Sequence, residues 1–204
     1  MNAWDIIRGI KEFKVKDTYC ILAVTNNDLY PRDSWNFVFG LADMTNHCGV
    51  FSFARHAVQI EGTDMTEEQR LLVTHRRSCS TMVHEIGHMF GLQHCIYYEC
   101  TMNGSNGSFE LAAHPNRTLC PICLAKLKIN CKFDCRARYN KLIEASQEFG
   151  FIKDVAFYSE IIADVHKQAA AARNNSQKPA EAAGRAARAR SPKPAAAAAA
   201  STRR

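Results

Sequence analysis

Residues 84–95 read HEIGHMFGLQHC, with three histidines, a glutamate, a glycine and a cysteine at close, regular spacing. His84 and His88 are four residues apart, so on an α-helix both imidazoles lie on one face and can bind the same ion. Gly91 predicts the end of that helix, which lets the chain turn back and bring His94 close as a third ligand. Three neutral imidazoles leave a divalent ion with an open coordination position, the pattern of catalytic zinc.

Glu85 follows the first of these histidines and is rotated about 100° from it around the helix, because a turn takes about 3.6 residues. Its carboxylate therefore stays beside the metal without binding it. Zinc lowers the pKa of a bound water to about 7, and Glu85 would take the proton and later deliver it to a leaving amine. A purely structural role is the alternative for the short H-E-x-x-H pattern, and the third histidine at this spacing disfavours it.

A second predicted metal site uses four cysteines in two pairs, C-x4-C and C-x2-C: Cys95, Cys100, Cys120 and Cys123. Four thiolates saturate a tetrahedral zinc, so this site is expected to be structural. Pro121 can begin a helix, whose dipole stabilises a thiolate. Consecutive side chains of an extended segment point to opposite sides, so His94 and Cys95 can bind two different ions. Four unrelated buried cysteines are the alternative, which the paired spacing disfavours.

At this spacing the chain resembles the archaemetzincins, a family of metzincin zinc metallopeptidases. Their pattern is H-E-x-x-H-x-x-G-x-x-H-C-x4-C-x-M-x17-C-x-x-C, and every fixed position is filled between His84 and Cys123. The upstream segments DLYPRDSWNFVFGLA, residues 28–42, and GVFSFAR, residues 49–55, also resemble the archaemetzincins of eukaryotes. The likeness covers roughly residues 19–128.

The resemblance implies a two-lobed metzincin fold with the active-site cleft between the lobes and two zinc ions per chain. Met102 would be the Met-turn residue, packed beneath the three histidines. Residues 49–55 would be the edge strand along the cleft, where an extended peptide can pair by backbone hydrogen bonds. The implied activity is hydrolysis of a peptide or protein substrate, with an aminopeptidase as one form. The sequence assigns no residue to substrate binding or to oxyanion stabilisation.

The order of apolar patterns predicts an α+β fold with a small mixed sheet. We expect helices over 2–15, from the capping box at Thr66 to Phe90, and over 121–129, 131–148 and 151–171, with strands over 19–25, 36–42 and 49–55. The segment 92–119 is predicted to be a loop. We divide the chain into an N-terminal lobe, 1–91, a mostly helical C-terminal lobe stapled by zinc, 92–172, and a disordered basic tail rich in Ala, Pro and Arg, 173–204.

The formal net charge of +6 belongs to the tail, because residues 173–204 hold eight basic residues and one acidic residue. The remaining chain is nearly neutral, which disfavours nucleic acid as a partner. The N-terminus lacks the apolar core of a secretory signal, and no apolar run is long enough to cross a bilayer. Nine cysteines, an odd number, favour metal binding in a reducing compartment. We therefore expect an intracellular protein, cytoplasmic or nuclear, without a membrane partner.

The chain departs from the metzincin pattern at its start. A strand precedes the first helix in metzincins, whereas this sequence begins at the segment expected to form that helix. We expect either an upstream segment in the native product or a smaller sheet. Two functions stay open: a zinc metallopeptidase, or a catalytically impaired or truncated metzincin that binds peptides or proteins. A nucleic-acid module is the third and least favoured.

Overall fold

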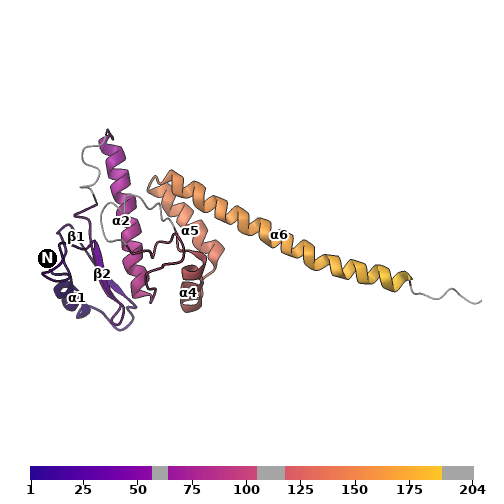
Figure 1. Ribbon diagram of the computed structural model, residues 1–204, viewed down its shortest axis with the longest axis horizontal. Helices are drawn as coiled ribbons and strands as arrows, with labels where there is room; N and C mark the ends of the chain where they lie inside the picture. Colours follow the sequence, from indigo (N-terminus) through magenta and orange to yellow (C-terminus); the bar gives the residue numbers. More distant parts are fainter. Residues whose placement is uncertain (57–63, 105–117, 190–204) are drawn as a thin grey trace, which may run out of the picture. The chain divides into compact units, whose positions relative to one another are not determined.

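The computed structural model describes residues 1–56, 64–104 and 118–189, with side chains as far as Arg173. Its elements are α1 (Ala3–Lys11), β1 (Ile21–Thr25), β2 (Gly40–Asp43), β3 (Cys48–Ser52), α2 (Glu67–Met89), α4 (Pro121–Cys131), α5 (Cys135–Glu148) and α6 (Ile152–Ala189) (Figure 1). The predicted α+β fold with a small mixed sheet is confirmed. Residues Met1–Tyr158 form one compact unit that contains every predicted site residue.

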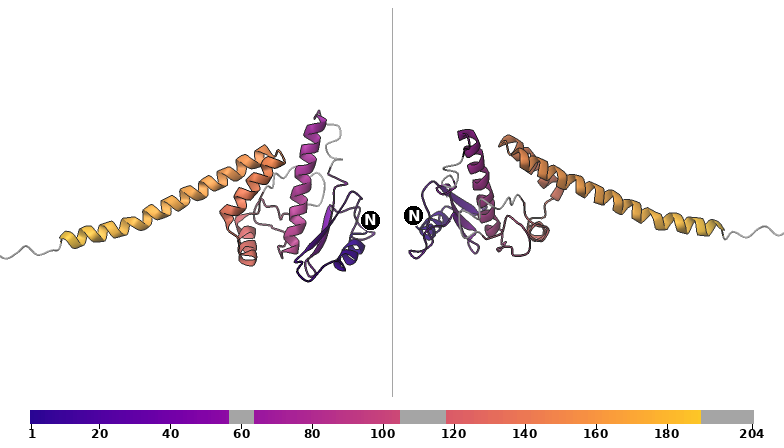
Figure 2. Two further views of the ribbon diagram at one scale, coloured as in Figure 1. Left: turned by 180° about the vertical axis from the view of Figure 1, so that it is seen from behind. Right: turned by 45° about the horizontal axis from the view of Figure 1, so that its top comes forward.

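The sheet has the strand order β1-β3-β2, with β3 parallel to β1 and antiparallel to β2. The prediction that residues 49–55 form the edge strand is wrong, because β3 is central and all five of its residues are buried. Gly49 faces Met89 of α2, whereas Val50 packs with α1. Figure 2 shows the sheet between these two helices. The two edge strands are β1 and β2.

The core on one face of the sheet is built around α1. Asn2 caps this helix by accepting hydrogen bonds from the backbone N–H groups of Trp4 and Asp5. The buried residues of this cluster are Ala3, Ile7, Leu29, Cys48 and Val50. The helix ends at Lys11, before the predicted end at residue 15. This packing fixes the sheet against which the long helix α2 lies.

Helix α2 begins and ends where the sequence predicts. Thr66 and Gln69 form a capping box, in which each side chain bonds the backbone N–H of the other. At the other end, Gly91 has a φ of +84°, a left-handed conformation that glycine adopts without strain. A buried stripe of Ser78, Thr81, Glu85 and Met89 runs along the helix at helical spacing.

The lobe after α2 has a core made largely of sulfur. Its buried residues are Leu92, Cys95, Cys100, Met102, Leu119, Cys120 and Cys123. Helix α4 starts with Cys120 as its N-cap and Pro121 in its first turn, as predicted. Helix α5 starts at Cys135 and not at residue 131, because Lys132 adopts a left-handed conformation and Asp134 caps the next helix.

Helix α6 is longer than predicted and continues from Ile152 to Ala189. The sequence predicted a helix end near residue 171 and a disordered tail from 173. Alanine, which dominates this stretch, has the highest helix propensity of all residues, and this favours continuation of the helix. Residues 190–204 of the predicted tail, like 105–117 of the predicted loop, lie outside the described part. Among the described helices, none is both long and apolar enough to span a bilayer.

Candidate active site and metal centres

The three predicted histidine ligands come together at the C-terminal end of α2. Nε2 of His84 lies 3.0 Å from Nε2 of His88. The ring of His94 has its centroid 5.2 Å from that of His84 and 4.9 Å from that of His88. One ligand atom from each of the three lies within 4.8 Å of the others. Two nitrogens bound tetrahedrally at about 2.0–2.1 Å are about 3.3 Å apart, so this spacing fits zinc.

Backbone carbonyls orient two of these imidazoles. Nδ1 of His84 lies 2.7 Å from the carbonyl oxygen of Thr101, and Nδ1 of His88 lies 2.7 Å from that of Leu92. A carbonyl only accepts, so each Nδ1 carries the proton and each Nε2 keeps its lone pair for a metal. Burial lowers the pKa of His84 to about 4 and also lowers that of His88. Both rings are therefore in the neutral form that binds a metal ion.

Met102, the predicted Met-turn residue, is fully buried against α2, the helix that carries His84 and His88. Its sulfur packs against Gly87, where an added Cβ would overlap Met102 Sδ. An added Cβ at Gly104 would lie 3.0 Å from Nδ1 of His94. Two glycines thus allow the chain to close around the imidazoles, and neither was singled out from the sequence. That Met102 forms the floor beneath the three histidines stays a prediction.

Glu85 lies on α2 and is buried where this helix meets Gly40, the first residue of β2. A Cβ at Gly40 would lie 2.5 Å from Glu85 Cγ and 2.8 Å from Oε1, so only glycine leaves room for the carboxylate. Burial raises the pKa of Glu85 to about 8. A divalent ion at the adjacent imidazoles would favour the carboxylate and lower this pKa. The glutamate is therefore placed for proton transfer beside the histidines.

The four predicted cysteine ligands form a sealed cluster. Their sulfurs lie within 4.8 Å of one another, and the four residues are between 0% and 7% exposed. Cys95 Sγ and Cys120 Sγ are 3.8 Å apart. This is too long for a disulfide, but two sulfurs bound tetrahedrally at about 2.3 Å are about 3.8 Å apart. The cluster fits zinc in both geometry and donor type.

Backbone N–H groups surround these sulfurs. Cys100 Sγ accepts from the N–H of Cys120 at 3.2 Å, and Cys120 Sγ accepts from the N–H of Cys123 at 3.4 Å. Burial raises the pKa of Cys100 and of Cys123. Burial of Cys95 is outweighed by hydrogen bonds with the backbone of Tyr97 and Tyr98, which lower its pKa to about 7. Four adjacent thiolates need a cation, and the N–H donors add to its effect.

Asn103 braces the loop that carries Cys95 and Cys100, and no sequence pattern singles it out. Its Nδ2 donates to the carbonyls of Cys95 and Tyr98 at 2.7 and 2.9 Å, and its Oδ1 accepts from the N–H of Cys100 at 2.8 Å. The neighbouring Thr101 supplies the carbonyl that orients His84. Residues 100–103 thus contact both sites. An asparagine in a loop is too common a turn former to reveal such a role.

A cleft of about 1580 Å³ opens beside the histidines. Its walls come from residues 34–42 on the side of the sheet, from α2, and from α5 with the start of α6. The carbonyl of Phe39 points toward β3, where it accepts a hydrogen bond from the N–H of Ser52. By antiparallel alternation, Gly40 and Ala42 direct their backbone groups away from β3. The free edge of β2 therefore runs along the cleft, in the place predicted for β3.

Comparison with known proteins agrees with this geometry. The sequence model of Peptidase family M54 matches residues 3–129, more than half of the chain. The chain belongs to this family. It is 41% identical over 164 residues to archaemetzincin-2 of Macaca fascicularis, and the match covers 70% of this chain and 45% of that protein. It is 28% identical over 165 residues to human archaemetzincin-1, covering 70% of this chain and 33% of that protein.

The crystal structure of archaemetzincin from Methanopyrus kandleri is similar in fold. Its TM-score is 0.51 at 28% identity, with 65% of this chain and 66% of that chain covered. The resemblance drawn from the residues between His84 and Cys123 is thus confirmed at the level of the M54 family. The chain spans less than half the length of the curated relatives it matches.

Proposed function

We propose that the chain is a zinc metallopeptidase in which His84, His88 and His94 hold a catalytic ion and Cys95, Cys100, Cys120 and Cys123 hold a structural one. The observation that carries the proposal is that three clustered imidazoles, two of them oriented by backbone carbonyls, lie beside a buried glutamate and an open cleft. Membership of the M54 peptidase family supports it. Zinc held by three imidazoles supplies a Lewis acid with an open position and lowers the pKa of its water to about 7.

The side chains of this chain divide the remaining work. Glu85 accepts the proton of the attacking water and passes it to the nitrogen of the leaving amine. Met102 and the carbonyls of Thr101 and Leu92 hold the imidazoles in place. The free edge of β2 holds the peptide backbone in extended form, since Gly40 and Ala42 offer unpaired donors and acceptors to the cleft. An aminopeptidase is one form of this activity.

The Glu85→Gln variant tests the proposal. It keeps the size of the side chain but cannot take a proton, so we expect both zinc ions to remain and hydrolysis of a peptide library to fall at least 100-fold. Zinc is counted by elemental mass spectrometry and cleavage by mass spectrometry of the library. Equal hydrolysis by the two proteins, or none by either, would leave the peptide-binding alternative as the better account.

A further inference from the structure

The cleft extends along α2 beyond the histidines and is lined there by the half-buried Arg77, one of whose terminal nitrogens is buried and unbonded among the described residues. Nη1 of Arg77 is buried and has no hydrogen-bond partner in the part of the chain that the structure describes. Arg77 lines the cleft. Burial lowers its pKa, as expected for a guanidinium taken out of water. A buried charge of this kind is costly unless an anion approaches it.

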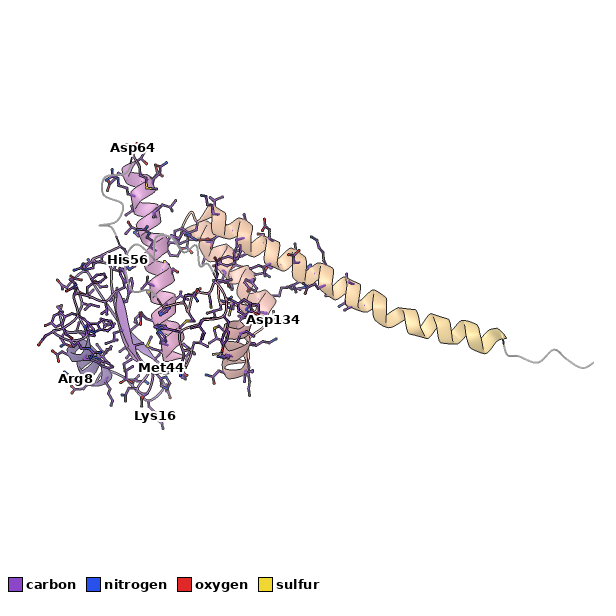
Figure 3. All side chains as sticks on the ribbon, in the orientation of Figure 1. Arg8, Lys16, Met44, His56, Asp64 and Asp134 are labelled. Carbon is purple, nitrogen blue, oxygen red and sulfur yellow. The ribbon has the colours of Figure 1, made fainter. Side chains whose placement is uncertain are left out.

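Among the described residues, no neighbour of Arg77 supplies a compensating negative charge. Arg76, the preceding residue, is already paired with Asp154 by two hydrogen bonds of 2.7 and 3.0 Å. On the sheet side lies His56, whose pKa falls to about 4 because of burial and, to a smaller extent, the charge of Arg77. His56 is neutral at pH 7 and supplies no negative charge. Figure 3 labels it beside the middle of α2.

Helix geometry places Arg77 relative to the reacting centre. It precedes His84 by seven residues, which is about 20° short of two full turns and about 10.5 Å along the axis. The two side chains therefore lie on nearly the same face of α2. An extended peptide advances about 3.3 Å per residue, so about three residues span this distance.

The direction of the strand β2 decides which end of a peptide reaches this arginine. Gly40 contacts Glu85, and His47, which follows the strand, lies 2.6 Å from the carbonyl of Met89. Phe39, which precedes the strand, stacks 5.1 Å from the ring of His56, near Arg77. β2 thus runs in the same direction as α2, with its start toward Arg77. A peptide added antiparallel, the more stable pairing, directs its C-terminal side toward Arg77.

We propose that Arg77 binds a carboxylate of the substrate about three residues to the C-terminal side of the cleaved bond. This inference rests on the proposed peptidase function and names its substrate class. A guanidinium binds a carboxylate through two parallel hydrogen bonds, which gives both affinity and orientation. The carboxylate is either the C-terminus of a short peptide or the side chain of an aspartate or glutamate at that position.

The test uses peptides with an N-terminal hydroxamate, a group that binds zinc and so fixes the register at the histidines. Three hydroxamate tripeptides are compared: one with a free C-terminus, one with a C-terminal amide, and one amide with aspartate as the third residue. Affinities for the zinc-loaded full chain are measured by calorimetry. We expect the first and third to bind about tenfold more tightly than the second, since hydrogen bonds to charged groups are strong. The same comparison of free acid with amide in hydroxamate dipeptides and pentapeptides should show a smaller difference in affinity.

Matched variants assign the effect to one residue. Arg77→Met should abolish the preference and Arg77→Lys should retain part of it. Arg70→Met is the control, because Arg70 lies one further seven-residue step along the same face and does not line the cleft. Arg138→Met is the second control, since Nη1 of Arg138 is also buried without a partner among the described residues but comes from α5. Both controls should keep the preference.

The outcomes separate this inference from the proposed function. Equal binding of all three tripeptides overturns the role of Arg77 and leaves the zinc site intact. A preference that persists in Arg77→Met, or that disappears only in Arg138→Met, overturns the assignment. Failure of every hydroxamate to bind refutes the open zinc site and the inference with it. If Arg77→Met does not fold, the comparison of acid and amide in the unmodified chain still decides whether a carboxylate is recognised.

Discussion

The two clusters of ligand side chains lie a few residues apart in the chain but differ in their access to solvent. His94 is exposed and His84 and His88 are half-buried, whereas the four cysteines are almost fully buried. The histidines line the cleft. The cysteines instead make up most of the core of their lobe, together with Met102 and two leucines. One cluster opens to the cleft, and the other takes the place of a hydrophobic core.

This difference in access to solvent predicts different consequences when a metal-binding side chain of each cluster is replaced. The cysteine cluster should be required for folding of its lobe, because little other apolar material is buried there. The histidine cluster should be required for activity and contribute less to stability, because its residues rest on a helix already packed against the sheet. Three experiments examine this contrast, in order of expected effect.

The largest effect is expected from Cys120→Ser. The variant should lose the structural zinc and destabilise the chain by more than about 5 kcal/mol, since structural zinc contributes on the order of 10 kcal/mol in small domains. Zinc content and urea unfolding measure the two effects. His88→Ala should also lose one zinc but cost only about 2 kcal/mol. The contrast between the clusters fails if both variants unfold at the same urea concentration.

A cysteine outside the cluster provides the control. Cys79 lines the cleft and is only half-buried. Cys79→Ser should keep both zinc ions and change stability by less than about 1 kcal/mol. A large loss in this variant would mean that any cysteine on these elements is needed, and not the four ligands in particular.

A smaller effect is expected where Met102 packs against Gly87, on the helix that carries His84 and His88. Gly87→Ala places a methyl group against the fully buried sulfur of Met102, which should cost up to about 3 kcal/mol through overpacking. The shift should weaken zinc binding at the histidines more than at the cysteines. Competition with a chelator, followed by counting the zinc retained, measures this. Gly9→Ala is the control, since a Cβ at Gly9 meets nothing within 4 Å. Release of both ions in parallel would contradict a local effect.

The smallest effect concerns the loss of stability in acid. It distinguishes the part of that loss that comes from the sheet core from the part that comes from the metal sites. The pKa of His56 is lowered to about 4 in the folded chain and is about 6.5 when unfolded. The unfolded chain therefore binds more protons between these values, and stability is lost as pH falls below about 6.5. By pH 5 the loss from His56 should be about 2 kcal/mol.

The variant His56→Phe isolates this contribution, because a ring remains beside Phe39 and Phe51. Urea unfolding at pH 7.5 and pH 5 is compared for the two proteins, with zinc content checked at both. The variant should lose about 2 kcal/mol less on acidification. If the two proteins lose stability equally, the acid effect belongs to the metal ligands.

Sequence reasoning succeeded where local spacing decides the geometry. The helix period brings His84 and His88 to one face, the glycine at 91 ends the helix, and Pro121 begins the next one. These features depend on residues close in sequence. The two clusters follow from them because the intervals in the motif are short.

The sequence could not decide the order of the strands. Residues 36–42 and 49–55 are both apolar and aromatic, and only long-range pairing with β1 places β3 in the centre. The close approaches at Gly40 and Gly87 were missed for the same reason, since each depends on a side chain brought from another element. Helix α6 is longer than predicted because the prediction considered only the small apolar bulk of its alanines and not their high helix propensity.

The short segment shared by the two clusters has a consequence for metal loading. Cys100 supplies a sulfur to one, Thr101 supplies a carbonyl to an imidazole of the other, and the sulfur of Met102 packs against Gly87 on the same helix as that imidazole. Occupancy at either place orders this tripeptide, so each ion raises the affinity of its neighbour, and linkage requires the two enhancements to be equal. Chains carrying a single ion should therefore be scarce during titration, and the protein would take up its two zinc ions cooperatively.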